Sequence, residues 1–221
     1  MDFVISSLKT NNLKEGDVLA ITSKIVSLSE NQICFKSAIK NKKELIQREA
    51  DVYLGESLYN HHITIKHNLL IPAAGIDESN TDGEYYILYP KNPYLTAQNI
   101  CKSLKKYYKL KKLGVILTDS HSTPLHRGVT GVSLAHWGFR GIESLVGQKD
   151  IFGRKLKFTH LNHADAIANM AVYFMGEANQ KNPLAVIKNL NLKFTNLDVS
   201  KDIPLKINED IYLSLLLKNL N

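Results

Sequence analysis

Two stretches of the sequence end an apolar run in oxygen-bearing side chains. "GVILTDSHSTPLHRGVTG" (114–131) passes from an apolar strand into Asp119 and Ser120, and "LLIPAAGID" (69–77) ends at Asp77. Ligands of α/β sheets collect beyond the carboxyl ends of strands, so these two ends predict a cleft with an aspartate on each side. Carboxylate and hydroxyl oxygens without cysteine suit Mg²⁺ or Mn²⁺, which bind through one or two carboxylates plus substrate phosphates.

Cationic side chains near these segments could neutralise phosphate charge. Lys24, Arg127 and Arg154 are the candidates, arginine as a bidentate fork and lysine as a point charge. Together with the oxygen ligands they predict a metal-assisted nucleotide site. The simpler interpretations stay open: a strand-end aspartate often caps the following turn, and Arg154 could pair with Asp150 on the surface.

Two other classes of function fit parts of the sequence. His121 and His126 lie near Asp119 and could serve a zinc-dependent hydrolase, although their spacing is loose and no third ligand is marked. The run "KKYYKLKK" (105–112) interleaves basic and aromatic residues as a nucleic-acid surface can, although a solvated helix face explains it as well. A serine triad is rejected because neighbours on an extended chain point to opposite faces.

Composition narrows these classes only in part. The 221 residues, 44% of them hydrophobic, can bury a core, and the net charge of +7 suits nucleic acid, an acidic membrane surface or a small polyanionic substrate. No apolar stretch is long enough to span a membrane, and the start lacks the pattern of a signal peptide. We therefore expect a cytoplasmic protein, with Cys34 and Cys101 reduced.

The elements that position the first of these residues are expected as follows. Residues 17–28 predict a strand broken by a polar corner at 22–24, and 41–58 predict a helix that ends near Gly55. Two strands around a turn at 67–68 are expected within 62–77. "NPYLTAQNICKSLKKYYK" predicts a helix with Asn92 as its N-cap and proline at its first position.

The second half of the chain predicts a strand over 113–118, a loop-rich stretch through 150–156 and a helix from Asn162 to a left-handed stop at Gly176. Glu177 then lies just past the helix end. The apolar face of this helix is expected to comprise Ala164, Ile167, Met170, Ala171, Phe174 and Met175. A strand over 184–190 and a capped helix over 208–220 complete the chain.

Five ordered segments resemble one family. "EGDVLAITSKIVSLSE", "AGIDESN", "LGVILTDSHSTPLHRGVTG", "DIFGRKL" and "MGEANQKNPLAVI" follow one another as in the γ-glutamyl ligases typified by the coenzyme F-420 (deazaflavin) ligase. "GIDESN", "TDSHSTPL", "HWGFRG" and "DIFGR" are most similar to the branch assigned to folate metabolism. The resemblance covers nearly the whole chain.

The resemblance implies an α+β fold with mixed sheets and packed helices, one domain over 1–221 with two interlocked subdomains, and an intertwined homodimer. It also implies a nucleoside triphosphate, ATP or GTP, with two divalent cations, Mg²⁺ or Mn²⁺. Matched one by one, Asp77 and Asp119 fall at the first metal, and Ser120 and Glu177 at the second. The nucleotide-contact positions are Ser23, Lys24, Asn80 and Gly176, and Arg127 joins the two aspartates as a catalytic candidate.

Two departures from the family pattern bear on the substrate. The deazaflavin enzymes usually carry a lysine where this chain has Leu28. Residues 2–17 resemble the helix that precedes "EGDVLAITSK" in the family, whereas the family's earlier strand, with its nucleotide-contacting residues, has no counterpart in this sequence. We therefore expect glutamate ligation to a folate, through an acyl phosphate, with the deazaflavin precursor as the alternative acceptor. Nucleic acid and membranes are not expected as partners.

Overall fold

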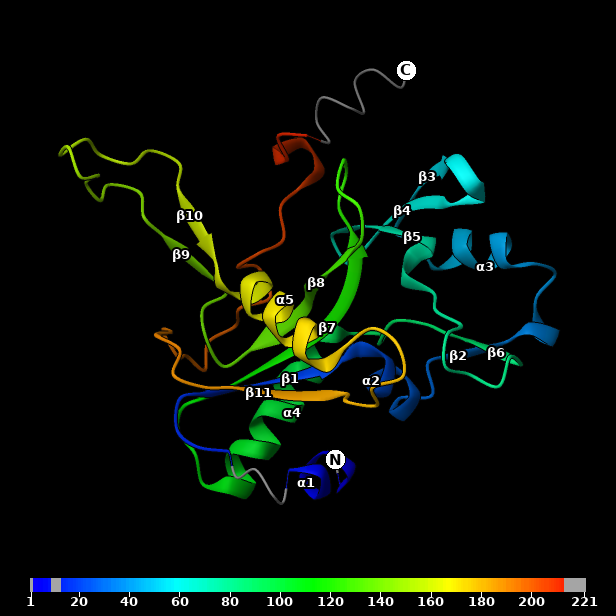
Figure 1. Cartoon of the computed structure of the whole chain (residues 1–221), viewed down its shortest axis with the longest axis horizontal. Helices are drawn as coiled ribbons and strands as arrows, with labels where there is room; N and C mark the ends of the chain where they lie inside the picture. Colours follow the sequence, from blue (N-terminus) through cyan, green and yellow to red (C-terminus); the bar gives the residue numbers. More distant parts are fainter. Residues whose placement is uncertain (1, 9–12, 213–221) are drawn as a thin grey trace.

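The computed structural model describes residues 2–8 and 13–212 (Figure 1). Its main layer is a four-stranded sheet in the order β11-β1-β7-β8. The inner strands β1 (Asp17–Thr22) and β7 (Leu113–Ser122) are parallel, and the outer strands β8 (Val129–Trp137) and β11 (Leu184–Ile187) run antiparallel to their neighbours. The carboxyl ends of β1 and β7 therefore meet at one edge.

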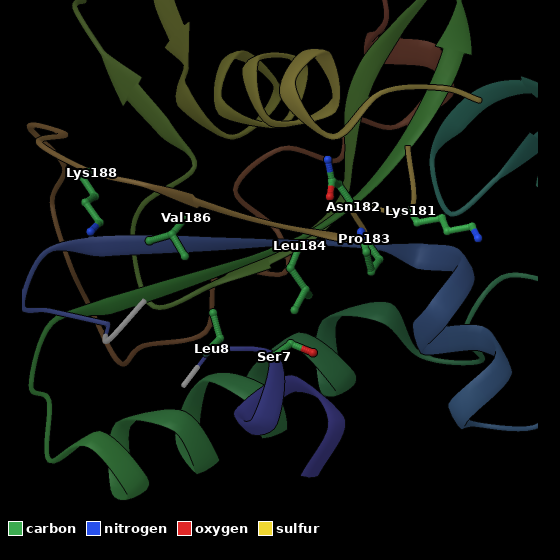
Figure 2. Close-up of a pocket in the computed structure, with 8 residues that line it drawn as sticks. All are labelled: Ser7, Leu8, Lys181, Asn182, Pro183, Leu184, Val186 and Lys188. Carbon is green, nitrogen blue, oxygen red and sulfur yellow. The ribbon is translucent and has the colours of Figure 1, made fainter. Parts of the chain in front are cut away.

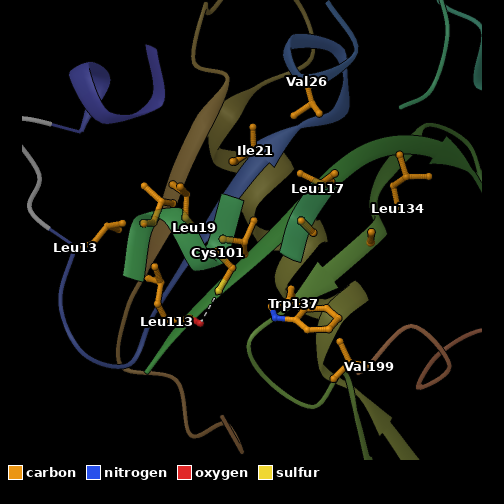
Figure 3. Close-up of a cluster of buried hydrophobic side chains, with 14 of the residues drawn as sticks. Leu13, Leu19, Ile21, Val26, Cys101, Leu113, Leu117, Leu134, Trp137 and Val199 are labelled. Atoms are coloured by element: carbon orange, nitrogen blue, oxygen red, sulfur yellow. Dashed lines mark hydrogen bonds between the residues drawn. The ribbon is translucent and has the colours of Figure 1, made fainter. Parts of the chain in front are cut away.

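Helices cover both faces of this sheet. α4 (Pro93–Tyr108) packs on one face and α5 (His163–Met175) on the other, with α1 (Asp2–Ser7) on the α4 side (Figure 1). Side chains alternate between the faces along β7, so Val115 and Leu117 join the cluster under α4, shown in Figure 3, while Ile116 joins the cluster under α5. β7 is therefore buried on both faces, between α4 and α5.

A smaller lobe lies beside the main sheet (Figure 1). It holds a three-stranded antiparallel sheet and a two-stranded sheet around a core of its own. Its strands are β2 (Ile33–Phe35), β3 (Val52–Glu56), β4 (His62–Lys66), β5 (Leu69–Pro72) and β6 (Tyr85–Ile87), and its helices are α3 (Lys42–Glu49) and the 3₁₀ turns η1 (Lys36–Ala38), η2 (Leu58–Asn60) and η3 (Ala73–Gly75). The helix α2 (Ser23–Ser29) connects β1 to this lobe.

A third feature is an arm, residues 142–162, that projects from the main sheet (Figure 1). It begins and ends with the paired strands β9 (Ile142–Ser144) and β10 (His160–Asn162). The remaining described element, η4 (Ile207–Glu209), is a short 3₁₀ turn near the carboxyl end. The expected helix over 208–220 lies mostly outside the described residues.

Several elements agree with the sequence predictions. The Asn92 side chain accepts a hydrogen bond from the Leu95 N–H at 3.1 Å and caps α4, and Asn162 caps α5 in the same way. His67 and Asn68 both have positive φ in the turn between β4 and β5. The mixed sheets and packed helices confirm the α+β class, while the division into interlocked subdomains stays a prediction.

Two predicted spans were wrong in the first half of the chain. Residues 17–28 form a strand only as far as Thr22, after which α2 begins. The helix expected over 41–58 ends at Glu49, and Val52 begins a strand instead. The Asp51 N–H donates a hydrogen bond to the Ile65 carbonyl, so the chain pairs with β4 from this point. The β-branched and aromatic residues that follow also favour a strand.

The expected end of the strand at residue 118 was also wrong, although the loop-rich character of 150–156 was right. β7 continues through Asp119 to Ser122, paired with β8 along its whole extension. The residue pattern suggested that the backbone leaves the sheet at Asp119, but the strand continues there. Residues 118–122 of β7 all line one cleft.

The buried face of α5 differs from the predicted one. Ala168 and Val172 are buried in place of Met170 and Phe174, which are 45% and 71% exposed. A Cβ at Gly131 would lie 2.5 Å from the Ala168 carbonyl oxygen. Glycine on β8 thus allows the helix backbone to approach the sheet closely, and this contact selects the small side chain of Ala168 as the buried one.

Candidate active site

A cleft of about 830 Å³ opens at the carboxyl edge of β1 and β7. Its lining comes from the end of β1 and the start of α2, from β5 and the loop after η3, from the end of β7 and the start of β8, and from the chain between α5 and β11. The residues expected to carry chemistry that line it are Lys24, Asp77, Asn80, Asp119, Ser120, His121, Gly176 and Glu177. Asp77 and Asp119 therefore line one cleft, as predicted, although β7 continues past Asp119 to Ser122 and β5 ends before Asp77, at Pro72.

Asp77 is held by neighbours on two segments. Its Oδ2 lies 2.6 Å from Lys24 Nζ, and its Oδ1 accepts the Ser79 N–H at 2.7 Å. Lys24 also donates to Ser79 Oγ at 2.8 Å. Burial raises the pKa of the Asp77 carboxyl, but these hydrogen bonds outweigh burial and leave the pKa below its ordinary value. Asp77 is therefore a carboxylate.

Asp119 has a different environment. Its Oδ2 accepts a hydrogen bond from the buried Tyr89 hydroxyl. Burial raises the pKa of Asp119 to about 6, against the lowering effect of hydrogen bonds from Tyr89 and the Ser120 backbone, and the charges of Asp77 and Glu177 raise it further. Three acidic groups from separate segments thus repel one another across the cleft, which is the electrostatic situation that a cation relieves.

Glu177 owes its position to the residue before it. Gly176 ends α5 with φ of +82° and ψ of 163°, so the backbone has the expected positive φ but turns into an extended rather than a left-handed helical conformation. A Cβ there would lie 2.4 Å from the Gln180 side chain. Glycine therefore permits the sharp exit that carries Glu177 into the cleft.

Some predicted site residues lie elsewhere. Ser23 is 4% exposed and does not line the cleft, although its neighbours Thr22 and Lys24 do. Arg127 lies in the exposed turn between β7 and β8 and is not among the residues that line the cleft. Arg154 pairs with Asp150, its Nε 3.1 Å from Oδ2, on the arm. The simpler interpretation of Arg154 as a surface ion pair is confirmed within this chain.

Sequence reasoning missed other residues of the region. Tyr89 is the clearest, because it contacts Asp119 from a segment with no motif. Gln180 and Asn182 also line the cleft. A smaller cavity of about 520 Å³ adjoins it between α1 and β11, with Leu184 and Val186 pointing toward α1 (Figure 2).

The acidic side chains of the cleft suit some metals better than others. Among residues 2–8 and 13–212, no group of three or more His, Cys, Asp or Glu side chains could hold one ion. Such a group is what a zinc site needs, so the arrangement of His121, His126 and Asp119 does not support the hydrolase alternative. Mg²⁺ and Mn²⁺ take one or two protein carboxylates with water and phosphate oxygens, and Asp77, Asp119 and Glu177 fit that requirement.

The fold and this cleft define an α+β protein with an acidic site that also contains a lysine. The model of the F420-0:gamma-glutamyl ligase family matches residues 1–189, so the chain belongs to this family. It is therefore an enzyme of the γ-glutamyl ligase class, which forms amide bonds with glutamate. No described helix has the length and apolar character needed to cross a membrane.

Three proteins similar to this chain share the name coenzyme F420:L-glutamate ligase. The chain is 33% identical over 218 residues to the coenzyme F420:L-glutamate ligase of Methanococcus maripaludis strain C7, covering 90% of this chain and 86% of the relative. It is 32% identical over 216 residues to the protein of that name from Methanocaldococcus jannaschii, covering 90% and 86%. The corresponding protein of Methanopyrus kandleri is 30% identical over 197 residues, covering 80% and 77%.

Proposed function

We propose that the cleft binds a nucleoside triphosphate with two divalent cations and joins L-glutamate to a carboxylate acceptor through an amide bond. The observation that supports this most is the convergence of Asp77, Asp119 and Glu177 on one cleft that also contains Lys24. Acids in such proximity favour cations, and a lysine beside them favours an anion. A triphosphate carrying metal ions satisfies both.

Each residue has a role in this proposal. Asp77 and Asp119 would hold one Mg²⁺ or Mn²⁺, and Ser120 and Glu177 the other. When bound, the cations neutralise phosphate charge and hold the attacking and leaving oxygens in line. Lys24 and Asn80 would contact the nucleotide, and the backbone at Gly176 would lie at its phosphate end. Both ATP and GTP are compatible with these roles.

The reaction proceeds in two steps. An oxygen of the acceptor carboxylate attacks the γ-phosphorus, the bond to the nucleoside diphosphate breaks, and an acyl phosphate forms. The amine of glutamate then attacks the acyl carbon, phosphate leaves, and the amine loses a proton. Lys24 serves the first step, since its ammonium can move from Asp77 to a phosphate oxygen. Arg127, in the exposed turn between β7 and β8, is the candidate for stabilising the transferred phosphate, and this role requires the turn to approach the cleft when substrate is bound.

The relatives favour the deazaflavin precursor as the acceptor, ahead of the folate expected from the sequence. They are named coenzyme F420:L-glutamate ligase. One of the two features that argued against this acceptor was Leu28, and Leu28 does not line the cleft. A folate-like acceptor is the second candidate, on the sequence segments that resemble the folate branch.

The enzyme is further proposed to work as a homodimer. Large apolar side chains lie exposed on the arm and on the outer side of α5, namely Val146, Ile151, Phe152, Phe158, Leu161, Met170, Tyr173 and Phe174. Exposed large apolar side chains in such number are typical of an interaction site, and a second copy would cover them. Light scattering coupled to size exclusion should give twice the monomer mass of 24.9 kDa, and a monomer at micromolar concentration would reject this part.

The function is tested by mass spectrometry of the acceptor. The purified protein receives Mg²⁺, ATP or GTP and L-glutamate, with the deazaflavin precursor or a reduced folate in separate reactions. The deazaflavin precursor should gain one glutamyl unit only when nucleotide and metal are both present. Extension of the folate alone would restore the second candidate, and turnover without nucleotide would support a hydrolase instead.

A further inference from the structure

A buried tyrosine supports the acidic cleft from behind. Tyr89 follows β6, is 6% exposed, and donates its hydroxyl hydrogen to Oδ2 of Asp119. It does not line the cleft, so it cannot touch a substrate there. A buried phenol usually needs a partner for its hydroxyl, and the partner in this case is a residue proposed to hold a metal.

The chain makes room for this contact. Gly75, at the end of η3, has φ of +70°, and a Cβ there would lie 2.2 Å from Cζ of Tyr89. A side chain at position 75 would therefore displace the Tyr89 ring, because the ring is buried and the new Cβ would be fixed to the backbone of η3. The His67 ring lies 6.0 Å from the Tyr89 ring, centroid to centroid, in a tilted arrangement. Gly75 and His67 thus both lie close to the Tyr89 ring.

We propose that Tyr89 is a positioning residue that fixes the carboxylate of Asp119 for metal binding, with Gly75 as the opening that lets its ring reach that carboxylate. The inference rests on the proposed function, since it concerns the metal assigned to Asp119. The phenol donates to Oδ2, and the carboxylate keeps further lone pairs with which it could bind a cation. Hydrogen bonds to metal-binding carboxylates set their orientation, and losing one costs about 10- to 100-fold in metal affinity or activity.

This arrangement also joins two parts of the fold. Asp119 belongs to β7 of the main sheet and Gly75 to η3 of the smaller lobe, while Tyr89 lies between β6 and α4 and packs in the core of the main sheet. Asp77 follows Gly75 by two residues, so the loop that makes room for the ring also carries the second metal-binding aspartate. The Tyr89 contact therefore sets how the two aspartates face each other across the cleft.

The test uses Tyr89→Phe, which removes one oxygen and keeps the ring. Mn²⁺ binding is followed by electron paramagnetic resonance, in separate titrations with the β,γ-imido analogues of GTP and ATP, alongside thermal unfolding of the metal-free protein. The dissociation constant for Mn²⁺ should rise about 10- to 100-fold, with a Tm within a few degrees of wild type. In turnover assays, more metal should be needed for half-maximal rate, while the rate at saturating metal is largely recovered.

Two further variants separate positioning from a structural role. Gly75→Ala should weaken Mn²⁺ binding in the same direction, because it displaces the ring. Tyr86→Phe, a tyrosine on β6 that is also buried, should keep Mn²⁺ affinity within twofold. Wild-type Mn²⁺ affinity in Tyr89→Phe or in Gly75→Ala would overturn the inference. Failure of the wild-type enzyme to bind Mn²⁺ with either analogue would instead count against the proposed function.

Discussion

Lys24 and Asp77 form an ion pair across the cleft, with Nζ 2.6 Å from Oδ2, although 53 positions separate them in the chain. The pair joins the start of α2 to the loop after η3, and Ser79 completes it through hydrogen bonds to both partners. In this arrangement Lys24 forms an ion pair with Asp77, the carboxylate that we propose binds a metal ion. Nucleotide and metal binding therefore require Lys24 to exchange Asp77 for a phosphate.

Lys24→Met should separate the binding of Lys24 to the nucleotide from its competition with the metal ion for Asp77. Losing a charged hydrogen bond to phosphate costs about 1.5–3 kcal/mol, so the KM for the nucleotide should rise about 10- to 100-fold. Mn²⁺ binding in the absence of nucleotide should become tighter, because the competing cation is gone. Lys42→Met is the matched control, since Lys42 forms an exposed ion pair with Glu78 at 3.4 Å and such pairs contribute little. Weaker Mn²⁺ binding in Lys24→Met would contradict this exchange.

Asp119→Asn should remove activity and stabilise the metal-free protein. The pKa of Asp119 is raised from 3.8 to about 6 in the folded state, so the folded state binds the proton more tightly and stability falls as pH rises from about 4 to about 6. At pH 7 the variant lacks this charge and should gain up to about 3 kcal/mol in free energy of unfolding.

Urea unfolding in EDTA at pH 4 and pH 7 measures this effect. The wild type should lose stability between the two pH values, and Asp119→Asn should lose less. Glutamate transfer by the variant should fall to near background with the fold intact. Near-normal turnover at ordinary Mg²⁺ would remove Asp119 from the metal site.

The metal requirement should depend on pH for the same reason. Asp119 must lose its proton before it can bind a cation. Below about pH 6 the metal concentration for half-maximal activity should therefore rise by about tenfold per pH unit, and above that pH it should level off. Steady-state rates across a Mg²⁺ series at several pH values measure this, and a requirement that stays constant from pH 7 to pH 5 would contradict the raised pKa.

Gly176→Ala should impair catalysis more than stability alone explains. The positive φ of +82° strains any side chain, and the new Cβ would press on Gln180, so Glu177 should shift and the rate should fall at least about tenfold. Gly16→Ala is the control: Gly16 has φ of +87° with nothing within 4 Å of a new Cβ, and it precedes β1 at the opposite edge of the sheet. Gly16→Ala should lose about 1–2 kcal/mol and Gly176→Ala at least as much, but only Gly176→Ala should lose rate at a temperature where both variants are folded. Equal rates in the two variants would argue against a role for Gly176 in placing Glu177.

Sequence alone was sufficient for features that depend on local pattern. Asp77 and Asp119 each end an apolar run, and glycine after an amphipathic helix indicates where Glu177 must lie, so these three positions follow from the order of residues around them. Capping side chains such as Asn92 are equally local. These signals are reliable because the residues within a few positions determine them.

Features that depend on tertiary contact were not accessible in this way. Tyr89 reaches Asp119 only because Gly75 leaves space, and no spacing in the sequence reveals that contact. Residues 129–137 contain polar residues and a glycine, yet pairing with β7 makes them a strand. The buried face of α5 follows from the close approach of the helix to Gly131, which places the small side chain of Ala168 against the sheet and leaves Met170 exposed.

The central claim is that this cleft joins glutamate to an acceptor at the expense of a nucleoside triphosphate, and one measurement tests it most directly. Wild type and Asp119→Asn are incubated with Mg²⁺, nucleotide, isotopically labelled glutamate and the deazaflavin precursor, and the acceptor is analysed by mass spectrometry. The account predicts one labelled glutamyl unit per acceptor with wild type, matched by nucleoside diphosphate formation, and neither with the variant. Labelled product from Asp119→Asn at the wild-type rate, or from wild type without nucleotide, would contradict it.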